Sequence, residues 1–408
     1  MTVGRILRSV ISAVSWLVPV LGAVVLTPSG AQAQDTIKFG APLPITGALS
    51  PEAAKAQQGY DIWAEQVNKA GGIKVGDRRL KVEMVYVDYQ SNTSRAVQAT
   101  EGLITQQKVD FLFSPFGSGA AKAASTVSER YKIPTIAATA SSAQVFDQNY
   151  KFLFGIYTPN ETLLTPFTDI VKKTAPNVKK VAILARNDLF PLALAQVMEQ
   201  AVKERGFTIV FNEKFAVNAL DHSAALSQIK AANPDWIFVA GYINDNLLIR
   251  KQMTDQRVGA EVVTMVTGPS YPEFIQAAGL AGSENVTGAA WWDPAVRYKS
   301  DDVFGSNEAY VKLFEEKYKF VPDYGHASHS AVGVILQMAI EKAGTTDREK
   351  VRDALAGLEE KTFFAPIKFA PNGQANSYIP PVYQIQQGKS VVIYPPEIKQ
   401  GELKFGVK

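Results

Sequence analysis

Small hydroxyl-bearing residues gather in two loops in the first half of the chain, where they could hold an anion. The first loop, residues 114–119, reads Ser-Pro-Phe-Gly-Ser-Gly and follows the apolar run Val109–Phe113. The second loop, Thr139–Ser142, closes the apolar run Pro134–Ala140. Both runs are short enough to be buried strands, and the Ala- and Ser-rich segment between them, up to Tyr131, can form a helix. Because ligands of open parallel sheets lie beyond the carboxyl ends of the strands, both loops would face one ligand.

A small carboxylate is the ligand that these two loops would suit. Free backbone N–H groups and the helix dipole favour an anion at the start of a helix. The candidate donors are the side chain of Ser118, the amides of Gly119 and Ala120, and the side chain of Thr139 or Ser141. In the alternative interpretation, Gly117 and Gly119 only form a tight turn. This stretch alone does not decide between the two.

Strands and helices alternate along the rest of the chain. Predicted strands cover residues 36–41, 82–88, 109–113, 134–140, 180–185, 207–211, 236–240, 262–266 and 286–292. Predicted helices cover residues 51–70, 94–107, the segment up to 131, 161–174, 190–205, 222–232, 246–256, 306–319, 327–342 and 348–358. This alternation favours parallel sheets covered by helices on both faces. The number of units exceeds one comfortable sheet, so we expect two lobes.

Length, charge and cysteine content exclude several classes of protein. The 408 residues are enough for two domains with full cores. A net charge of +3 over this length gives no reason to expect a nucleic acid or an anionic membrane surface as a partner. The chain has no cysteine, which excludes disulfides, a thiol nucleophile and a lipid-modified N-terminal cysteine.

The N-terminal segment has the pattern of a secretory signal peptide. Arg5 and Arg8 precede the apolar stretch Val10–Leu26, and Ala31-Gln32-Ala33 has the form of an A-x-A cleavage site. A retained membrane anchor is the alternative, because the stretch is near the length that spans a bilayer. A proline and a glycine within it, together with the cleavage motif, favour removal. We therefore predict a signal peptide over residues 1–33 and a mature protein free in the periplasm, without a lipid anchor.

The sequence contains no set of residues typical of an enzyme. It lacks a G-x-G-x-x-G after the first strand, a P-loop, a G-x-S-x-G and an H-E-x-x-H motif. His326 and His329 lie one helical turn apart and could share a metal, but no third ligand is nearby, so we interpret them as residues at the start of a helix. The carboxylate pairs Asp301-Asp302 and Glu359-Glu360 stand in polar, exposed runs. We expect no catalysis, no cofactor and no metal.

Short motifs are spread over nearly the whole of the predicted mature chain. They are Ile37-Lys38-Phe39-Gly40 with the Thr46-Gly47 loop, Asn68-Lys69-Ala70-Gly71-Gly72-Ile73, Asp88, Gly117-Ser118-Gly119, Lys180–Ala185 followed by Arg186-Asn187-Asp188, Asp235–Gly241 followed by Tyr242, and Phe369-Ala370-Pro371-Asn372-Gly373-Gln374. In this order and spacing they resemble the periplasmic substrate-binding proteins of ABC transporters, in particular the leucine/isoleucine/valine-binding type. Each motif is weak alone, and their combination carries the resemblance.

The resemblance implies an α/β architecture of the type I periplasmic binding protein fold, with two Rossmann-like lobes joined by three hinge crossings. Lobe 1 would comprise residues 34–158 and 294–378, and lobe 2 residues 159–293 and 379–408. A ligand that contacts both lobes only when they are closed shifts the population toward the closed state. The implied protein is a monomeric, non-enzymatic receptor that delivers a small-molecule carboxylate to ABC permease subunits in the inner membrane.

Other functions of the same architecture remain open at this point. A periplasmic sensor of the same fold would pass its signal to a membrane kinase or a regulator, and sequence alone does not separate it from a transport receptor. An exported α/β enzyme is disfavoured by the missing catalytic set. A DNA-responsive regulator is disfavoured because the signal peptide occupies the place of a DNA-binding head, so we expect no nucleic acid partner.

The resemblance also implies which residues line the ligand site. Carboxylate-binding elements fall on loops of lobe 1, aromatic side chains of lobe 2 pack on the ligand, and a further lining position of lobe 1 falls on or near Glu52. The predicted ligand-binding residues are Leu49, Glu52, Ser118, Gly119, Thr139, Ala140, Ser141, Phe190, Tyr242, Ser270 and Trp292.

One of these positions departs from the family pattern. In the amino-acid binders an acidic side chain just after a Gly-Pro pair takes the ligand's ammonium, whereas here Gly268-Pro269 is followed by Ser270. Breaking a buried ion pair costs about 3–5 kcal/mol, which a neutral serine does not offset. Either Glu52, Asp188 or Asp293 replaces the acid, or the ligand has no α-ammonium. We favour a hydrophobic or aromatic acid without an α-amino group.

Aromatic residues at the predicted lobe crossings can also face the cleft. Trp291 and Trp292 end the predicted strand 286–292, and Tyr157 lies at the first crossing. Adjacent side chains of a strand point to opposite faces, so at most one of the two tryptophans reaches the pocket. We predict Trp292, with interior packing as the alternative.

Overall fold

The computed structural model describes residues 35–407, and the predicted signal peptide lies outside this range. The first sheet has six strands in the order β2-β3-β1-β4-β5-β6. These strands are β1 (Thr36–Leu43), β2 (Ile73–Val75), β3 (Arg78–Asp88), β4 (Phe111–Phe113), β5 (Thr135–Ala137) and β6 (Leu153–Gly155). All pairings are parallel except that of β2, which forms an antiparallel hairpin with β3.

The second sheet has seven strands in the order β15-β14-β11-β10-β9-β7-β8. They are β7 (Lys180–Arg186), β8 (Thr208–Phe215), β9 (Trp236–Ala240), β10 (Val262–Val266), β11 (Thr287–Ala289), β14 (Val382–Gln386) and β15 (Lys389–Tyr394). Strands β7 to β11 pair in parallel, and β14 and β15 extend the sheet as antiparallel strands. The predicted alternation therefore produced two parallel-based sheets.

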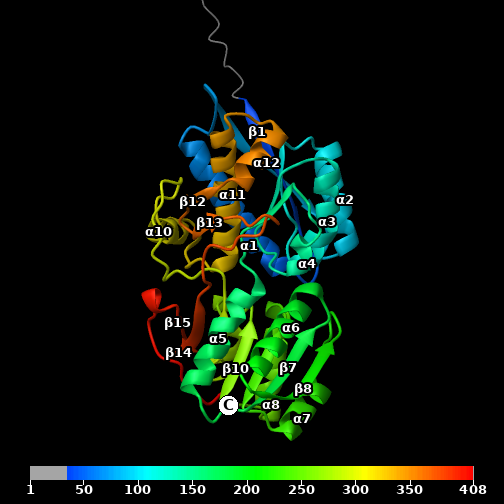
Figure 1. Ribbon diagram of the computed structural model, residues 1–408, viewed down its shortest axis with the longest axis vertical. Helices are drawn as coiled ribbons and strands as arrows, with labels where there is room; N and C mark the ends of the chain where they lie inside the picture. Colours follow the sequence, from blue (N-terminus) through cyan, green and yellow to red (C-terminus); the bar gives the residue numbers. More distant parts are fainter. Residues whose placement is uncertain (1–34, 408) are drawn as a thin grey trace, which may run out of the picture. The chain divides into compact units, whose positions relative to one another are not determined.

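Helices flank both sheets, as Figure 1 shows. With the first sheet lie α1 (Ser50–Lys69), α2 (Thr93–Thr105), α3 (Ser118–Arg130), α4 (Ala143–Phe146), α10 (Asn307–Tyr318), α11 (Tyr324–Ala343), α12 (Arg348–Ala356) and the hairpin of β12 (Glu359–Lys361) and β13 (Pro366–Lys368). With the second lie α5 (Asn160–Thr174), α6 (Leu189–Glu204), α7 (Ser223–Ala232), α8 (Ile243–Gln256), α9 (Pro272–Ser283) and the short 3-10 helix η1 (Pro396–Ile398).

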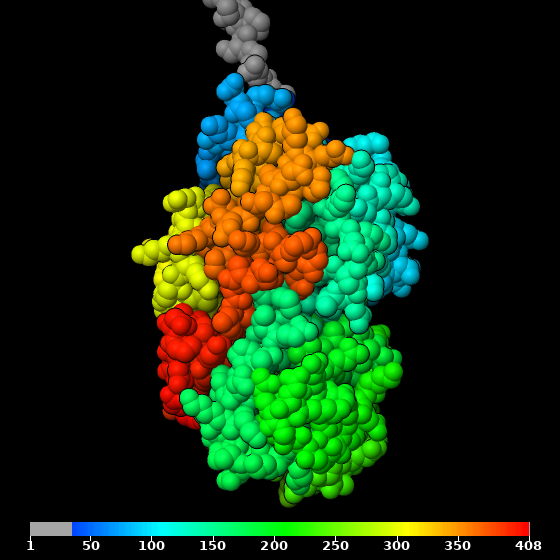
Figure 2. Space-filling view, viewed as in Figure 1, coloured from blue at the N-terminus to red at the C-terminus, as the bar shows by residue number. Residues whose placement is uncertain are grey.

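Segments that are far apart in the sequence pack together around each sheet. Helix α11 packs against α1, and the ring of Trp63 lies so close to Gly333 that a Cβ there would come within 2.3 Å of it. In Figure 2 the orange segment, which contains α12, lies against the blue and cyan N-terminal segments, and the red C-terminal segment lies against the green one. The chain thus passes between the sheets three times: from β6 to β7, from β11 to α10, and from β13 to β14.

Two differences between the predicted and the observed elements bear on the site. The strand predicted over residues 286–292 is shorter, because β11 ends at Ala289 and leaves both tryptophans outside the ladder. Helix α9 was not predicted from the sequence. Its second half is rich in Ala and Gly and has no apolar period, and Gly279 interrupts it with a positive φ of 69°.

Candidate functional site

The start of helix α3 brings the two hydroxyl-rich loops together. Ser118, the first residue of α3, is buried, and its Oγ accepts hydrogen bonds from the N–H groups of Ser141 and Ser142 at 3.3 Å each. Gly117, at φ 82°, donates its N–H to Thr139 Oγ1 at 3.1 Å. Since the Oγ of Ser118 already accepts two bonds, its own proton remains free to be donated.

Further donors lie beside Ser118. The hydroxyls of Ser141 and Ser142 are buried and have no hydrogen-bond partner among residues 35–407. Ala140 between the loops is fully buried, and Gly119, as the second residue of α3, has an N–H without an acceptor in its own helix. The arrangement offers several N–H and O–H donors to one anion. Thr139 contributes indirectly, because its Oγ1 holds the Gly117 turn.

The predicted lobe 2 aromatics face this region. Phe190, at the start of α6, is 4 % exposed, and its ring centroid lies 6.0 Å from that of Tyr242 and 6.1 Å from that of Trp291. Trp291 stacks on Tyr157 at 4.0 Å with an interplanar angle of 5° and donates its Nε1–H to the carbonyl of Thr158. These rings form an apolar wall.

The two tryptophans have different neighbours. Trp292 packs edge-on against Tyr310 of α10, and its buried Nε1 has no partner among the described residues. Trp291, and not the predicted Trp292, lies beside Phe190. The prediction assumed strand geometry at these positions, but β11 ends two residues earlier. Trp291 is therefore the tryptophan that we carry into the proposed site.

A pair of stacked tyrosines, absent from the predicted site, lies next to Ser270. Tyr271 stacks on Tyr324 with centroids 5.1 Å apart, and its hydroxyl donates to Glu52 Oε2 at 3.1 Å. Ser270 is half-buried, and its side chain lies beside the hydroxyl of Tyr383. The sequence offered one sign of Tyr271: it is an aromatic residue that stands shortly after the Gly-Pro pair and directly before Pro272. Tyr271 is the N-cap of α9, a helix that we did not predict, and Pro272 is its first residue.

Glu52 differs from the other two acids that could replace the missing ammonium acceptor. Asp188 caps α6 by accepting from the N–H of Leu189 at 2.7 Å, and Asp293 accepts from the N–H of Ala295 at 2.8 Å. Burial raises the pKa of Asp293 to about 6 and that of Glu52 to about 7. Of the three, only Glu52 has a buried carboxylate oxygen without a partner.

A buried ion cluster stands beside Glu52. Lys55, one turn further along α1, places its Nζ 2.6 Å from Asp323 Oδ2 and 2.8 Å from Glu273 Oε1. Burial alone would lower the pKa of Lys55, but these carboxylates raise it above its usual range. Burial alone would raise the pKa of Asp323, but His326 and Lys55 hold it well below its usual range. Because Glu273 belongs to α9, this cluster ties α1 to the second sheet's helices.

The remaining predicted residue, Leu49, lies in a small hollow. This hollow of about 180 Å³ is lined by Leu49, Tyr89, Ser91, Thr93, Phe116, Gly117, Gly119, Ala120, Arg186, Asn187, Asp188, Val217 and Tyr242. Its lining residues come from loops and helices around both the first and the second sheet. A side chain at Gly119 would meet Asp188 Oδ1 at 3.2 Å, so the small residue allows the close approach.

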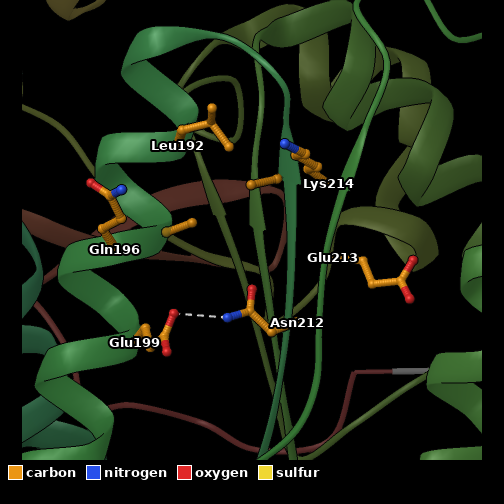
Figure 3. A pocket seen from close by; sticks show the side chains of 8 residues that line it. Leu192, Gln196, Glu199, Asn212, Glu213 and Lys214 are labelled. Carbon is orange, nitrogen blue, oxygen red and sulfur yellow. Dashed lines mark hydrogen bonds between the residues drawn. The ribbon is translucent and has the colours of Figure 1, made fainter.

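A larger hollow of about 530 Å³ lies elsewhere, between α6 and β8. In Figure 3, Glu199 of the helix points toward Asn212 of the strand, and Asn212 Nδ2 donates to Glu199 Oε2 at 2.9 Å. None of its lining side chains has a buried polar atom without a partner. It therefore lacks the unsatisfied groups that mark the region around Ser118 and Glu52.

The two helix-start histidines make hydrogen bonds within the protein. His326 Nδ1 lies 2.9 Å from Asp323 Oδ1, and its Nε2 lies 3.0 Å from Gln58 Oε1. His329 Nδ1 lies 2.6 Å from the carbonyl of Gly325. Residues 35–407 contain no group of three or more metal-ligating side chains of His, Cys, Asp or Glu type. Over the same range, no helix is both long and apolar enough to cross a membrane.

Comparisons with solved structures identify the architecture. The substrate-binding protein LivJ of Streptococcus pneumoniae, solved with isoleucine, superposes with a TM-score of 0.76 at 24 % identity, over 88 % of this chain and 100 % of that one. A solute-binding protein of R. palustris, solved with benzoate, gives 0.74 at 21 % identity, over 90 % and 100 %. The predicted type I periplasmic binding protein fold is thus confirmed.

Sequence comparison points to the same group. The Leu/Ile/Val-binding protein homolog 7 of Brucella suis is 26 % identical over 403 residues, which cover 94 % of this chain and 98 % of the relative. The family described as periplasmic binding protein matches residues 36–389. The chain therefore belongs to the periplasmic binding protein family.

Proposed function

We propose that this protein is the soluble receptor of an ABC importer, and that it closes its lobes on a small hydrophobic or aromatic carboxylate without an α-amino group. The observation that carries the proposal is the pair of unpaired hydroxyls at Ser141 and Ser142 beside Ser118, which lies near an aromatic wall. The receptor is exported to the periplasm, has no enzymatic activity, acts as a monomer and delivers its ligand to permease subunits. Its lobes divide at the residues given by the sequence prediction.

The donors around Ser118 support a carboxylate as the recognised group. A carboxylate has about four lone-pair sites, and charge-assisted hydrogen bonds to an ionised acceptor are stronger than neutral ones. The hydroxyls of Ser118 and Ser141 and the N–H of Gly119 lie at the start of a helix, where the dipole also favours negative charge. Without an anion, the hydroxyl of Ser141 carries the penalty of a buried, unsatisfied polar atom.

The opposite wall supports a hydrophobic body for the ligand. Phe190, Tyr242, Trp291, Tyr157 and Tyr324 bring large apolar surfaces together. By the resemblance, Ser270 stands where an amino-acid binder of this family has its acid, and a serine side chain carries no charge. The relatives in this fold include proteins solved with isoleucine and with benzoate, so both amino acids and aromatic acids are compatible with the architecture.

Thermal unfolding with a panel of acids tests the proposal. The panel holds leucine, isoleucine and valine, their 2-oxo acids, benzoate, 3-phenylpropanoate and simple amides. A ligand at a hundred times its dissociation constant adds about 2.7 kcal/mol to the stability, enough for a clear rise in melting temperature. We expect the rise with acids that lack an amine. A rise only with the three amino acids would refute this choice of ligand.

Ser141→Ala should weaken carboxylate binding without unfolding the protein. It removes one donor that has no partner inside the protein, so we expect a loss of affinity of about tenfold, since hydrogen bonds to charged groups contribute about 1.5–3 kcal/mol. Calorimetric titration with benzoate measures the change. Ser300→Ala is the matched control, because that hydroxyl is also buried and has no partner among residues 35–407, but it lies in the loop between β11 and α10. Equal effects of the two substitutions would argue against the anion site at α3.

Trp291→Leu and Trp292→Leu should have different effects, the first on ligand affinity and the second on stability. Trp291 contributes to the wall with Phe190, so its loss should weaken benzoate binding about tenfold or more. Trp292 packs on Tyr310 instead, so Trp292→Leu should change stability but leave the affinity within about threefold. The affinities are compared by calorimetry after circular dichroism has verified the fold. The reverse order of effects would restore Trp292 to the site.

A further inference from the structure

Glu52 presents a buried acceptor that no group of the protein satisfies. The residue lies in the first turn of α1 and is 2 % exposed. Its Oε2 accepts from the hydroxyl of Tyr271 at 3.1 Å, while its Oε1 has no hydrogen-bond partner among residues 35–407. Most buried polar atoms of native proteins are paired, so such an exception requires an explanation.

The carboxylate of Glu52 stands among the aromatic residues of the proposed site. Tyr271, whose hydroxyl bonds to it, stacks on Tyr324, and the ring centroid of Tyr324 lies 6.4 Å from those of Tyr157 and Trp291. These residues come from the N-cap of α9, from the start of α11, and from the segments that follow β6 and β11. The unpaired oxygen therefore belongs to the region in which these aromatic elements converge.

The nearest cation does not satisfy Glu52. Lys55 Nζ is engaged by Asp323 at 2.6 Å and by Glu273 at 2.8 Å, and it lies 4.0 Å above the ring of Tyr271. Its charge lowers the pKa of Glu52, but burial, the larger effect, raises that pKa to about 7. At neutral pH the carboxyl is therefore a mixture of the protonated and ionised forms.

We infer that the ligand carries a neutral hydrogen-bond donor, such as a hydroxyl, on its hydrophobic body, and that Glu52 Oε1 accepts it. This inference rests on the proposed function, which it narrows from hydrophobic acids to hydroxylated ones. A hydroxyl can bond to either form of the carboxyl, whereas an ammonium requires the ionised form and would stand near the charge of Lys55. A ligand without a donor leaves the oxygen buried and unpaired.

Matched pairs of acids test the inference on the whole protein. The pairs are benzoate with 4-hydroxybenzoate, and 3-phenylpropanoate with 3-(4-hydroxyphenyl)propanoate, titrated by calorimetry at pH 7. In at least one pair we expect the hydroxylated acid to bind about tenfold or more tightly. The corresponding methoxy acid has no donor, so it should bind no better than the parent acid, and this comparison needs no variant of the protein.

Substitution then assigns the effect to Glu52. In Glu52→Met, which has similar length and no strong acceptor, the preference for the hydroxyl should fall below about twofold. In Asp293→Asn, which changes another buried carboxyl outside the aromatic group, the preference should persist. A preference retained in Glu52→Met, or absent from the unmodified protein although the acids bind, would overturn the inference and leave the proposed function standing. Binding of amino acids alone would instead overturn the proposed function.

Discussion

Lys55→Met should destabilise the protein by about 3 kcal/mol or more at pH 7. Lys55 is 4 % exposed, and its Nζ lies 2.6 Å from Asp323, which is equally buried. Removing one partner of a buried ion pair costs about 3–5 kcal/mol, because the other charge stays buried. His326 Nδ1, 2.9 Å from Asp323, and the N–H of Gly325, also at 2.9 Å, offset part of this loss, so we expect the lower end of the range.

Urea unfolding at pH 7 measures the effect, with Glu273→Gln as the matched control. Glu273 pairs with the same ammonium at 2.8 Å, but its side chain is 53 % exposed, so its loss should change stability by at most about 1 kcal/mol. The double variant with Asp323→Asn should recover part of the loss, since it removes the stranded charge. If Lys55→Met cost no more than Glu273→Gln, Asp323 would have to be satisfied without Lys55.

The sequence predicted the architecture well because its strands are buried on both faces. The apolar runs 236–240 and 262–266 form β9 and β10 with the predicted bounds, since a central parallel strand needs a continuous apolar run. Elements without such a pattern were missed. Helix α9 owes its position to Pro272 and to packing against α8, whereas its own sequence is interrupted at Gly279. Tertiary contacts, and not a local sequence pattern, therefore determine that α9 forms.

The candidate site was predictable only where the local pattern itself carries chemistry. Ser118 and Ser141 follow two adjacent parallel strands, so topology brings their loops together. The contact of Glu52 with Tyr271 joins residues 219 positions apart and depends on how the lobes meet, which no local pattern encodes. The neighbours of the two tryptophans could not be predicted either, because the argument from strand alternation does not hold beyond the end of β11, and the choice between them stays a prediction.

The pH dependence of stability should reveal the unusual state of Glu52. Its pKa rises from the ordinary 4.5 to about 7 because burial disfavours the charged form. Between these two pH values the folded protein keeps a proton that the unfolded chain has released, so the contribution of Glu52 to stability falls as pH rises. The pKa difference corresponds to about 3 kcal/mol. Glu52→Gln should therefore gain about this much over the unmodified protein between pH 4.5 and pH 8.

The measurement compares urea unfolding of the two proteins at pH 4.5, 6, 7 and 8. Carboxylate buffers must be avoided, because the proposed ligand is itself a carboxylate and would stabilise the folded state. Glu65→Gln is the control: hydrogen bonds from Lys317 and Lys69 lower the pKa of Glu65, so this substitution should not produce the gain at high pH. A gain independent of pH would mean that Glu52 ionises as it does in water. Its carboxylate would then be hydrated in the free protein, and a ligand hydroxyl would have to displace that water to reach Oε1.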